Sequence, residues 1–343
     1  MFGFGKKDKS EEGKINVAPV LQEENAGEEI TPLRKPKIGL ALGAGVARGW
    51  AHIGVIRGLE AKGIKPDVIA GTSIGAVVGG AMATDSLDEL EAWARSLKSN
   101  SFFRWLDFKF GGSGLFGSNK LNDLMDERFG NNNIEDLKIP FTAVACELKT
   151  GHEIWLKEGD LSDCIQASFA LPGVFEPKRL KRKWLVDGAL VNPVPVSVCR
   201  AQACDLIIAV NLSEDLYGRT RARRRGTADT GEYGVFAETG IMPKSIKATG
   251  SSGFFNKLFS HKGDAPSLFA NMVASLNILQ NRLSRSRLAG DPPDVTITPR
   301  CGHIGLMEFH RSEELIDEGA HAFEEAWPHI QDAYDAITHQ INS

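Results

Sequence analysis

The stretch 71–75, Gly-Thr-Ser-Ile-Gly, constrains the fold of this chain more than any other part of it. An apolar, strand-like run at 68–70 leads into Ser73, and small or apolar residues at helical spacing follow. A G-x-S-x-G sequence between a strand and a helix is typical of a nucleophile elbow, which strains the serine backbone and holds its hydroxyl out at the top of a sheet. The flanking glycines avoid a clash with the neighbouring strand or helix. The stretch therefore predicts an α/β sheet with a reactive serine at its edge.

A glycine-rich loop lies one strand earlier in the chain. Residues 37–42 have the pattern of a buried strand, residues 43–49 read Gly-Ala-Gly-Val-Ala-Arg-Gly, and a helical pattern runs from about 48 to 62. With the elbow strand, these segments predict a βαβ unit whose two strands are parallel. The loop should then lie beside Ser73 at the carboxyl ends of the strands, where α/β sheets hold their sites.

Two interpretations of this loop compete. A dinucleotide-binding loop would read G-x-G-x-x-G and would be followed by an acidic residue at the end of the second strand. Arg48 fills the third glycine position, however, and Asp67 stands at the beginning of that strand. We therefore interpret the loop as an oxyanion hole, with the N–H groups of Gly43, Gly45 and Val46 as donors. Arg48 either supports the anion or braces the loop through carbonyl groups, and we favour bracing, because a cation held in the site would also bind water and products.

A carboxylate follows a second buried strand. The run Trp-Leu-Val at 184–186 precedes Asp187, and Gly188 and Ala189 come next. An ionised aspartate after a buried strand costs desolvation energy unless partners stabilise it. Asp187 is therefore either a turn residue or a partner of the elbow serine.

The remaining segments complete an alternation of strands and helices. We expect a hairpin at 141–147 and 152–157, a helix capped by Asp160 that runs to 170, a buried strand at 206–212, a helix at about 266–289, a strand at 294–298 and a closing helix from 311 to about 326.

The glycine loop, the elbow, the Asp187-Gly-Ala turn and the segment 172–177 (Pro-Gly-Val-Phe-Glu-Pro) together resemble the patatin-like phospholipase family, in particular its bacterial cytoplasmic members related to neuropathy target esterase. The resemblance covers about residues 37–212. It implies an α/β fold, a three-layer α/β/α sandwich with a mainly parallel central sheet. It also implies that Ser73 is the nucleophile, that Asp187 is its only catalytic partner, and that the loop 43–49 is the oxyanion hole.

The implied reaction is the hydrolysis of fatty-acyl esters of phospholipids or lysophospholipids, with no metal or other cofactor. Many relatives have an unbroken run of glycines where this chain has Ala44 and Val46. The donor N–H groups are the same with these residues, whereas the alanine and valine side chains can change the width of the pocket. A desolvated Asp187 would accept the serine proton, since a carboxylate of ordinary pKa is a poor base for serine.

Three alternatives stay open at this point. A Ser-Asp-His triad needs a histidine after the aspartate in chain order, and His303 or His310 could serve, although neither lies in a motif. His52 is close to the predicted site but precedes Ser73. A non-catalytic protein of the same fold could sense acyl lipids, and acyl transfer to an alcohol other than water is a variant of the main interpretation.

Composition limits the class of protein further. A formal net charge of −4 and a pI near 6.1 argue against a nucleic-acid binder. Five cysteines without a C-x-x-C pair are typical of a reducing compartment and indicate neither a disulfide framework nor a zinc site. No apolar run reaches the roughly 18 residues of a membrane span. We therefore expect a cytoplasmic protein.

The domain organisation follows from changes in composition. We expect a disordered tail at 1–35 and one patatin-like domain at 36–343 with a mobile insertion at about 213–265. Phenylalanines among cations occur at positions 2 and 4 and at 254–259. They either contact the inner face of a membrane or belong, at 2 and 4, to a disordered end, which we favour there, and, at 254–259, to a solvated loop that packs its own phenylalanines. The aromatic stretch 102–110 is either core or the wall of an acyl-chain site.

Overall fold

The computed structural model describes residues 34–98, 132–213 and 268–343, with positions 107–108, 116–117, 123, 125–127 and 129 between them. The predicted tail, the aromatic stretch 102–110 and the insertion at 213–265 lie almost entirely outside these residues. The phenylalanines at positions 2 and 4 and at 254–259, which suggested membrane contact, lie outside them as well.

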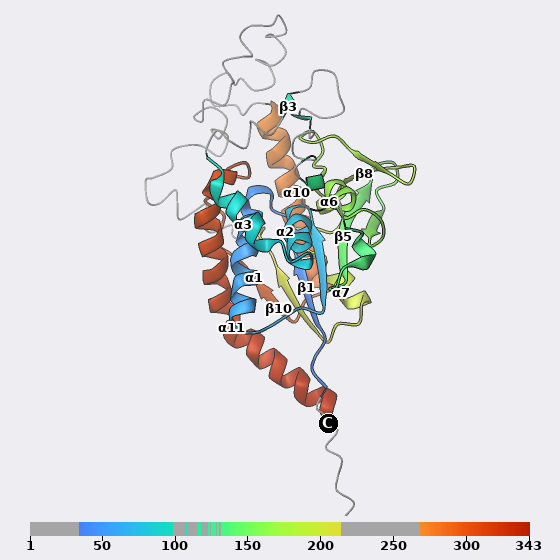
Figure 1. Ribbon diagram of the computed structural model, residues 1–343. Helices are drawn as coiled ribbons and strands as arrows, with labels where there is room; N and C mark the ends of the chain where they lie inside the picture. The colour runs from blue at the N-terminus through green and yellow to red at the C-terminus, as the bar shows by residue number, and fades with distance from the viewer. Residues whose placement is uncertain are drawn as a thin grey trace, which may run out of the picture. The chain divides into compact units, whose positions relative to one another are not determined.

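A central β-sheet dominates the fold (Figure 1). Its strands are β1 (Ile38–Leu42), β2 (Val68–Thr72), β5 (Phe141–Glu147), β6 (Glu153–Leu156), β7 (Lys178–Leu180), β8 (Lys183–Asp187), β9 (Leu206–Val210) and β10 (Val295–Ile297). Their order is β10-β9-β1-β2-β5-β8-β7, with β6 also paired to β5. The pairs from β10 to β5 are parallel, whereas β5–β6, β5–β8 and β7–β8 are antiparallel. The short strands β3 (Asp107–Phe108) and β4 (Phe116–Gly117) form a separate antiparallel pair.

Helices cover both faces of this sheet. One face packs against α1 (Ala51–Ala61), α2 (Ile74–Ala83), α3 (Leu87–Ser96), α6 (Leu161–Phe169) and α11 (Ser312–Asn342). The other packs against α7 (Val196–Ala201) and the C-terminal part of α10 (Leu268–Gly290). Short 3₁₀ turns occur at η1 (Val46–Trp50), η2 (Ile134–Asp136), η3 (Gly188–Leu190) and η6 (Phe309–Arg311). The three-layer α/β/α sandwich expected from the sequence is thereby confirmed.

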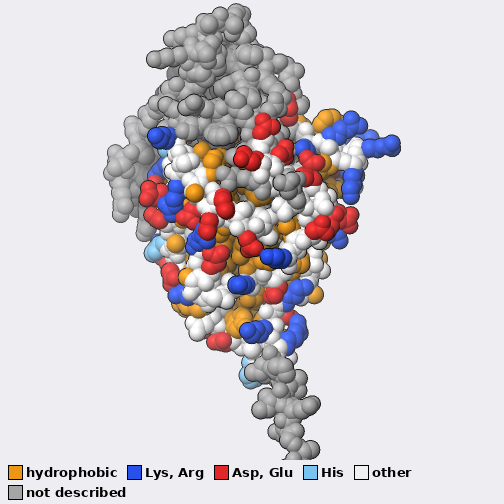
Figure 2. Space-filling view, in the orientation of Figure 1, with side chains coloured by type: hydrophobic (Ala, Val, Ile, Leu, Met, Phe, Trp, Pro, Cys, Tyr) orange, Lys and Arg blue, Asp and Glu red, His pale blue; other side chains and the backbone are white. Residues whose placement is uncertain are grey.

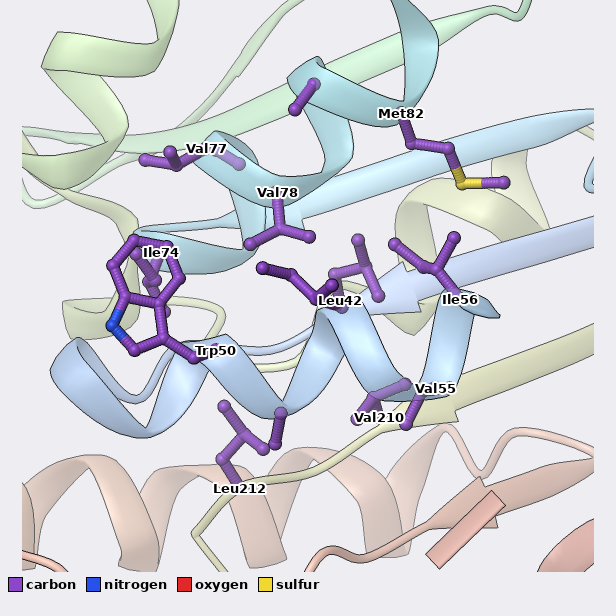
Figure 3. Packing of buried hydrophobic residues seen from close by; sticks show 14 of the residues in the cluster. Leu42, Trp50, Val55, Ile56, Ile74, Val77, Val78, Met82, Val210 and Leu212 are labelled. Atoms are coloured by element: carbon purple, nitrogen blue, oxygen red, sulfur yellow. The ribbon is translucent and has the colours of Figure 1, made fainter. Parts of the chain in front are cut away.

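The strand sequences explain why both faces are covered. Leu40 and Leu42 of β1 belong to the larger apolar cluster, while Ala41 between them belongs to the cluster on the opposite face. Successive side chains of a strand point to opposite faces, so a strand that is apolar at every position needs cover on both sides. Figure 3 shows Leu42 between α1 and α2, near Val78 and Ile56.

The closing helix is longer than the sequence pattern predicted. We expected it to end near Ala326, but α11 continues to Asn342 and includes Pro328. A proline inside a helix removes one backbone donor and clashes with the preceding turn, which normally costs about 3 kcal/mol. The apolar stripe continues past the proline and packs against the core, and this burial offsets the cost; its members are Ala326, Ile330, Ala333, Tyr334 and Ile337.

Strand β5 has three neighbours, and their registers position the site. β2 ends with Thr72 opposite Val144, and β8 ends with Asp187 opposite the next residue, Ala145. β6 pairs with residues 143–146, which overlap both registers. Because one edge of a strand accepts one partner at each position, β6 must occupy one edge of β5 while β2 and β8 share the other. The ends of β2 and β8 therefore meet on that edge.

Close contact between α1 and α11 gives a test of the packing. A Cβ added to Gly54 of α1 would lie 1.9 Å from the Ile316 carbonyl oxygen of α11. Since backbone cannot move aside cheaply, Gly54→Ala should lower the free energy of unfolding by about 3 kcal/mol in urea denaturation. Gly290→Ala is the matched control, because nothing lies within 4 Å of its added Cβ. Equal stabilities of the two variants would contradict the described helix contact.

Candidate active site

Ser73 lies in a strained turn at the end of β2. Its backbone has φ 60° and ψ −125°, a conformation that residues other than glycine rarely adopt, and it is the N-cap residue of α2. A Cβ at Gly75 would lie 2.2 Å from the Leu42 carbonyl oxygen, and one at Gly71 would lie 2.5 Å from that of Gly75. The strand, sharp turn and helix predicted for this stretch are confirmed, and so is the steric need for both glycines.

Ser73 and Asp187 are hydrogen-bonded to each other. The Ser73 hydroxyl donates to Oδ2 of Asp187 at 2.6 Å, and the Ala189 amide donates to Oδ1 at 2.8 Å. Both side chains are almost completely buried, with exposed fractions of 2% for Ser73 and 1% for Asp187. The contact follows from the strand pairing, because Ser73 directly follows the last residue of β2 and Asp187 is the last residue of β8.

Burial changes the acidity of this carboxyl group. Desolvation raises the pKa of Asp187 from 3.8 to about 7, while the hydrogen bonds from Ser73 and Ala189 act in the opposite direction. Removing a carboxylate from water disfavours its charged form, and here this outweighs two hydrogen bonds to the anion. A base with a pKa near 7 is suited to accept and return a proton at neutral pH.

Ser168 of α6 joins the end of β2 to β5 and was not anticipated from the sequence. It is fully buried, accepts a hydrogen bond from the Ser73 amide at 2.9 Å and donates to the Val144 carbonyl at 2.6 Å. Val144 is the last residue of β5 that pairs with β2, and the next residue, Ala145, pairs with β8. The Ser168 hydroxyl therefore satisfies backbone groups at the point where the partner strand of β5 changes. A serine between Ala167 and Phe169 on a buried helix was the only sequence signal for it.

The glycine loop agrees only in part with the expected oxyanion hole. The Gly43 amide donates to the Val210 carbonyl at 3.1 Å, which extends the pairing of β1 with β9, so Gly43 is not a free donor as we had expected. The N–H groups of Gly45 and Val46 make no hydrogen bond within the described part of the chain. Val46 has φ 52°, a strained conformation for a β-branched residue.

Two buried side chains brace this loop. Arg48 donates through Nε to the Ile304 carbonyl at 2.8 Å, which is the bracing contact that the sequence analysis favoured. His52 donates through Nε2 to the Gly43 carbonyl at 2.7 Å. Burial lowers the pKa of His52 to about 4, so the ring is neutral at pH 7 and the carbonyl partner fixes the proton on Nε2.

The loop after Asp187 is joined to both other segments. The Thr72 hydroxyl donates to the Asn192 carbonyl at 2.9 Å, and the Ala44 amide donates to the Pro193 carbonyl at 2.8 Å. Three stretches distant in the sequence are therefore held in one arrangement by backbone carbonyls. The sequence holds no signal for this role, because any residue type can supply a backbone carbonyl as acceptor.

The histidines proposed for a triad lie elsewhere. His303 is hydrogen-bonded to Oε1 of Glu314 at 2.7 Å. His310 lines a surface hollow with Arg311, Glu313, Glu314, Asp317, Glu318 and His321, and neither Ser73 nor Asp187 borders it. Among the described residues, no three His, Cys, Asp or Glu side chains are arranged to hold a metal ion. Within the same residues, no helix is both long and apolar enough to cross a membrane.

Comparison with known proteins identifies the family. Residues 40–200 match the patatin-like phospholipases. The NTE family protein Rv1063c of Mycobacterium tuberculosis is 33% identical over 83% of this chain and 89% of its own length. Lysophospholipase NTE1 of Coccidioides immitis is 33% identical over 51% of this chain and 11% of its own.

These matches define the class as lipid hydrolases of the patatin-like phospholipase family, and this chain belongs to that family. Within it, the chain is similar to NTE family proteins over most of its length.

Ser168 offers a test of the site's construction. Ser168→Ala leaves the Ser73 amide and the Val144 carbonyl without this partner in a buried place, so the free energy of unfolding should fall by about 2 kcal/mol. The same substitution should also slow the reaction of Ser73 with a fluorophosphonate, because the turn at Ser73 loses the hydrogen bond from its amide to Ser168. Ser162→Ala, on the same buried helix but hydrogen-bonded to Asp126 and Gln166, is the control. If it slowed labelling as much as Ser168→Ala does, loss of stability alone would explain the effect.

The raised pKa of Asp187 predicts an unusual dependence of the free energy of unfolding on pH. A carboxyl group whose pKa is raised from 3.8 to about 7 on folding binds its proton more tightly in the folded state. Its contribution to stability is complete below pH 4 and is lost as the pH rises to about 7, by up to about 4 kcal/mol. Asp187→Asn lacks this loss, so its stability relative to wild type should increase by roughly 2 kcal/mol between pH 5.5 and 7.5.

Urea denaturation at both pH values measures this difference, and Asp335→Asn, an exposed carboxylate on α11, controls for the removal of one negative charge. A difference between Asp187→Asn and wild type that does not change with pH would show that the Asp187 carboxyl titrates as an exposed one does.

Proposed function

We propose that this protein is a serine acyl hydrolase that cleaves fatty-acyl esters of phospholipids or lysophospholipids, with Ser73 as nucleophile and Asp187 as its base. The observation that carries this proposal is the 2.6 Å hydrogen bond between the Ser73 hydroxyl and the Asp187 carboxylate, both buried at the carboxyl edge of the sheet. Membership of a lipid hydrolase family supports the acyl-ester substrate, and one relative is described as a lysophospholipase.

The first half of the reaction forms an acyl-enzyme. Asp187 takes the proton of the Ser73 hydroxyl as the oxygen attacks the ester carbonyl carbon, and the carbonyl oxygen becomes an oxyanion. The N–H groups of Gly45 and Val46 stabilise this anion, each contributing about 3 kcal/mol to the lowering of the barrier. The tetrahedral intermediate then breaks its bond to the alcohol, which receives the proton from Asp187 and leaves.

The second half releases the fatty acid. Asp187 accepts a proton from water as the water oxygen attacks the acyl carbon, and the same amides stabilise the second oxyanion. When the bond to Ser73 breaks, the serine oxygen recovers a proton from Asp187. A base with a pKa near 7 can accept and return protons in both halves. These steps use only side chains and amides of this chain.

Analysis of the products tests the proposal. Purified protein is incubated with a phosphatidylglycerol or a lysophosphatidylcholine, and released fatty acid is measured by mass spectrometry. We expect Ser73→Ala and Asp187→Asn each to lower the rate by about 10³-fold or more. The His303 side chain is hydrogen-bonded to Glu314 rather than to Ser73 or Asp187, so His303→Ala should retain wild-type activity.

Other outcomes would favour the alternatives. If folded wild-type protein binds acyl lipid but releases no fatty acid, the lipid-sensing interpretation is correct. If activity survives in Asp187→Asn but is lost in His303→Ala or His310→Ala, a triad operates. If an added alcohol is acylated in preference to water, the enzyme is an acyltransferase.

A further inference from the structure

Two large apolar side chains are exposed side by side beyond the site. Leu148 and Trp184 have exposed fractions of 54% and 50%. They are adjacent because the Leu148 amide donates to the Trp184 carbonyl at 2.8 Å, one residue past Glu147 and Leu185, the last register pair of β5 and β8. An exposed tryptophan and leucine side by side form an apolar surface that a partner can cover.

The registers place these side chains on the same edge of the sheet as Ser73. β5 runs parallel to β2, so the carboxyl ends of both strands lie at one edge, and Leu148 follows β5 there. β8 runs in the opposite direction, and Trp184 precedes Asp187 by three residues on it. At about 3.3 Å per residue, Trp184 lies roughly 10 Å beyond the level of Asp187 along the strands.

Positive charge surrounds the two apolar side chains. The turn between β7 and β8 consists of Lys181 and Arg182, both with positive φ, and projects further from the same edge. The guanidinium of Arg179 lies 5.7 Å from the centre of the Trp184 ring. We call this surface the hairpin rim; its exposed members are Leu148, Lys149, Arg179, Lys181, Arg182, Lys183 and Trp184.

Acidic neighbours neutralise only part of this charge. Lys183 pairs with Glu147 at 3.0 Å, and Lys181 pairs with Glu158 at 3.7 Å. The other cations of the rim, Lys149, Arg179 and Arg182, form no ion pair within the described residues. Figure 2 shows Lys and Arg side chains gathered with hydrophobic ones at the projecting corner near β8.

We propose that the hairpin rim is the membrane-docking surface of this protein and that its partner is a bilayer containing anionic phospholipid. Tryptophan is suited to the boundary between headgroups and acyl chains, because it buries its ring and leaves the indole N–H near water. Lysine and arginine around it are attracted to anionic headgroups. The combination fits a lipid surface better than an apolar protein groove, which would leave these cations desolvated.

The position of the rim connects docking to the proposed function, on which this inference rests. A bilayer held at Trp184 lies roughly 10 Å from the level of Ser73. An acyl ester would then reach the serine by rising part of the way out of the bilayer, without dissolving in water.

Vesicle sedimentation tests docking independently of hydrolysis. The full-length Ser73→Ala protein is mixed with vesicles of phosphatidylcholine alone or of phosphatidylcholine with phosphatidylglycerol, and the bound fraction is measured. We expect binding to the anionic vesicles only, weakening with added salt. In this background Arg182→Glu and Trp184→Ser should each lower the partition coefficient by about fivefold or more.

Matched controls separate the rim from general charge or hydrophobicity. Lys65→Glu makes the same change of charge before β2, at the amino edge of the sheet. Leu279→Ser removes an exposed leucine on α10, where its exposed fraction is 62%. Both should bind vesicles as the parent protein does. If the rim and control variants weaken vesicle binding equally, or if the rim variants do not weaken it at all, the proposal is wrong.

Activity measurements distinguish docking from catalysis. In the protein with Ser73 intact, the rim variants should lose activity on vesicle phospholipid but keep wild-type activity on a water-soluble short-chain ester. Vesicle binding without any esterase activity would refute the proposed function and leave docking standing. If light scattering shows that Trp184→Ser dissociates an oligomer while vesicle binding is unchanged, the rim contacts a second copy of the chain and the proposal is wrong.

Discussion

The arrangement of β2 and β8 along one edge of β5 is the constraint on which the rest of the site depends. A parallel strand ends at Thr72, an antiparallel strand ends at the adjacent register position, and the residues at the two ends are Ser73 and Asp187. Hydrogen bonding in the sheet therefore brings the Ser73 hydroxyl and the Asp187 carboxylate, the proposed nucleophile and base, to 2.6 Å from each other. Ser168 accepts a hydrogen bond from the Ser73 amide and donates one to the Val144 carbonyl, so a side chain also ties the end of β2 to β5.

This construction concentrates unfavourable features in one place. Ser73 and Val46 have strained backbones, Asp187 is a buried carboxyl group, and Nδ1 of His52 is buried without a partner in the described residues. The strained backbones and the unpartnered nitrogen each cost roughly 1 to 3 kcal/mol, and the buried Asp187 costs up to about 4 kcal/mol as it ionises, so the rest of the fold must be well packed. The apolar layers on both faces of the sheet supply that stability. The strain and burial hold the Ser73 hydroxyl in place and give the Asp187 carboxyl group a pKa close to neutral pH, as the proposed role of base requires.

Local pattern predicted the turn at Ser73 and an α/β sheet, whereas the three-layer sandwich and the pairing of Ser73 with Asp187 were implied by the family resemblance. A G-x-S-x-G stretch between a strand and a helix is typical of one backbone conformation, the sharp turn at the serine. An aspartate after a buried strand stands out because burying its charge costs desolvation energy. The Gly43 amide was misassigned, since whether an N–H is free depends on how far β1 continues to pair with β9. Ser168 and the carbonyls of Asn192 and Pro193 were not found, because their roles arise from contacts between segments distant in the chain. The length of α11 was underestimated for the same reason, since tertiary burial keeps Pro328 within the helix.

The most direct test of this account is the rate at which a fluorophosphonate labels Ser73 as the pH is changed, followed by mass spectrometry of the intact protein. If Asp187 is the base, the rate in wild type should rise with pH to a plateau, with a midpoint near pH 7, as the carboxyl group ionises. In Asp187→Asn that rise should be absent and labelling should be slower at every pH. A rate in wild type that is already at its plateau at pH 5, or rapid labelling of folded Asp187→Asn, would contradict the account.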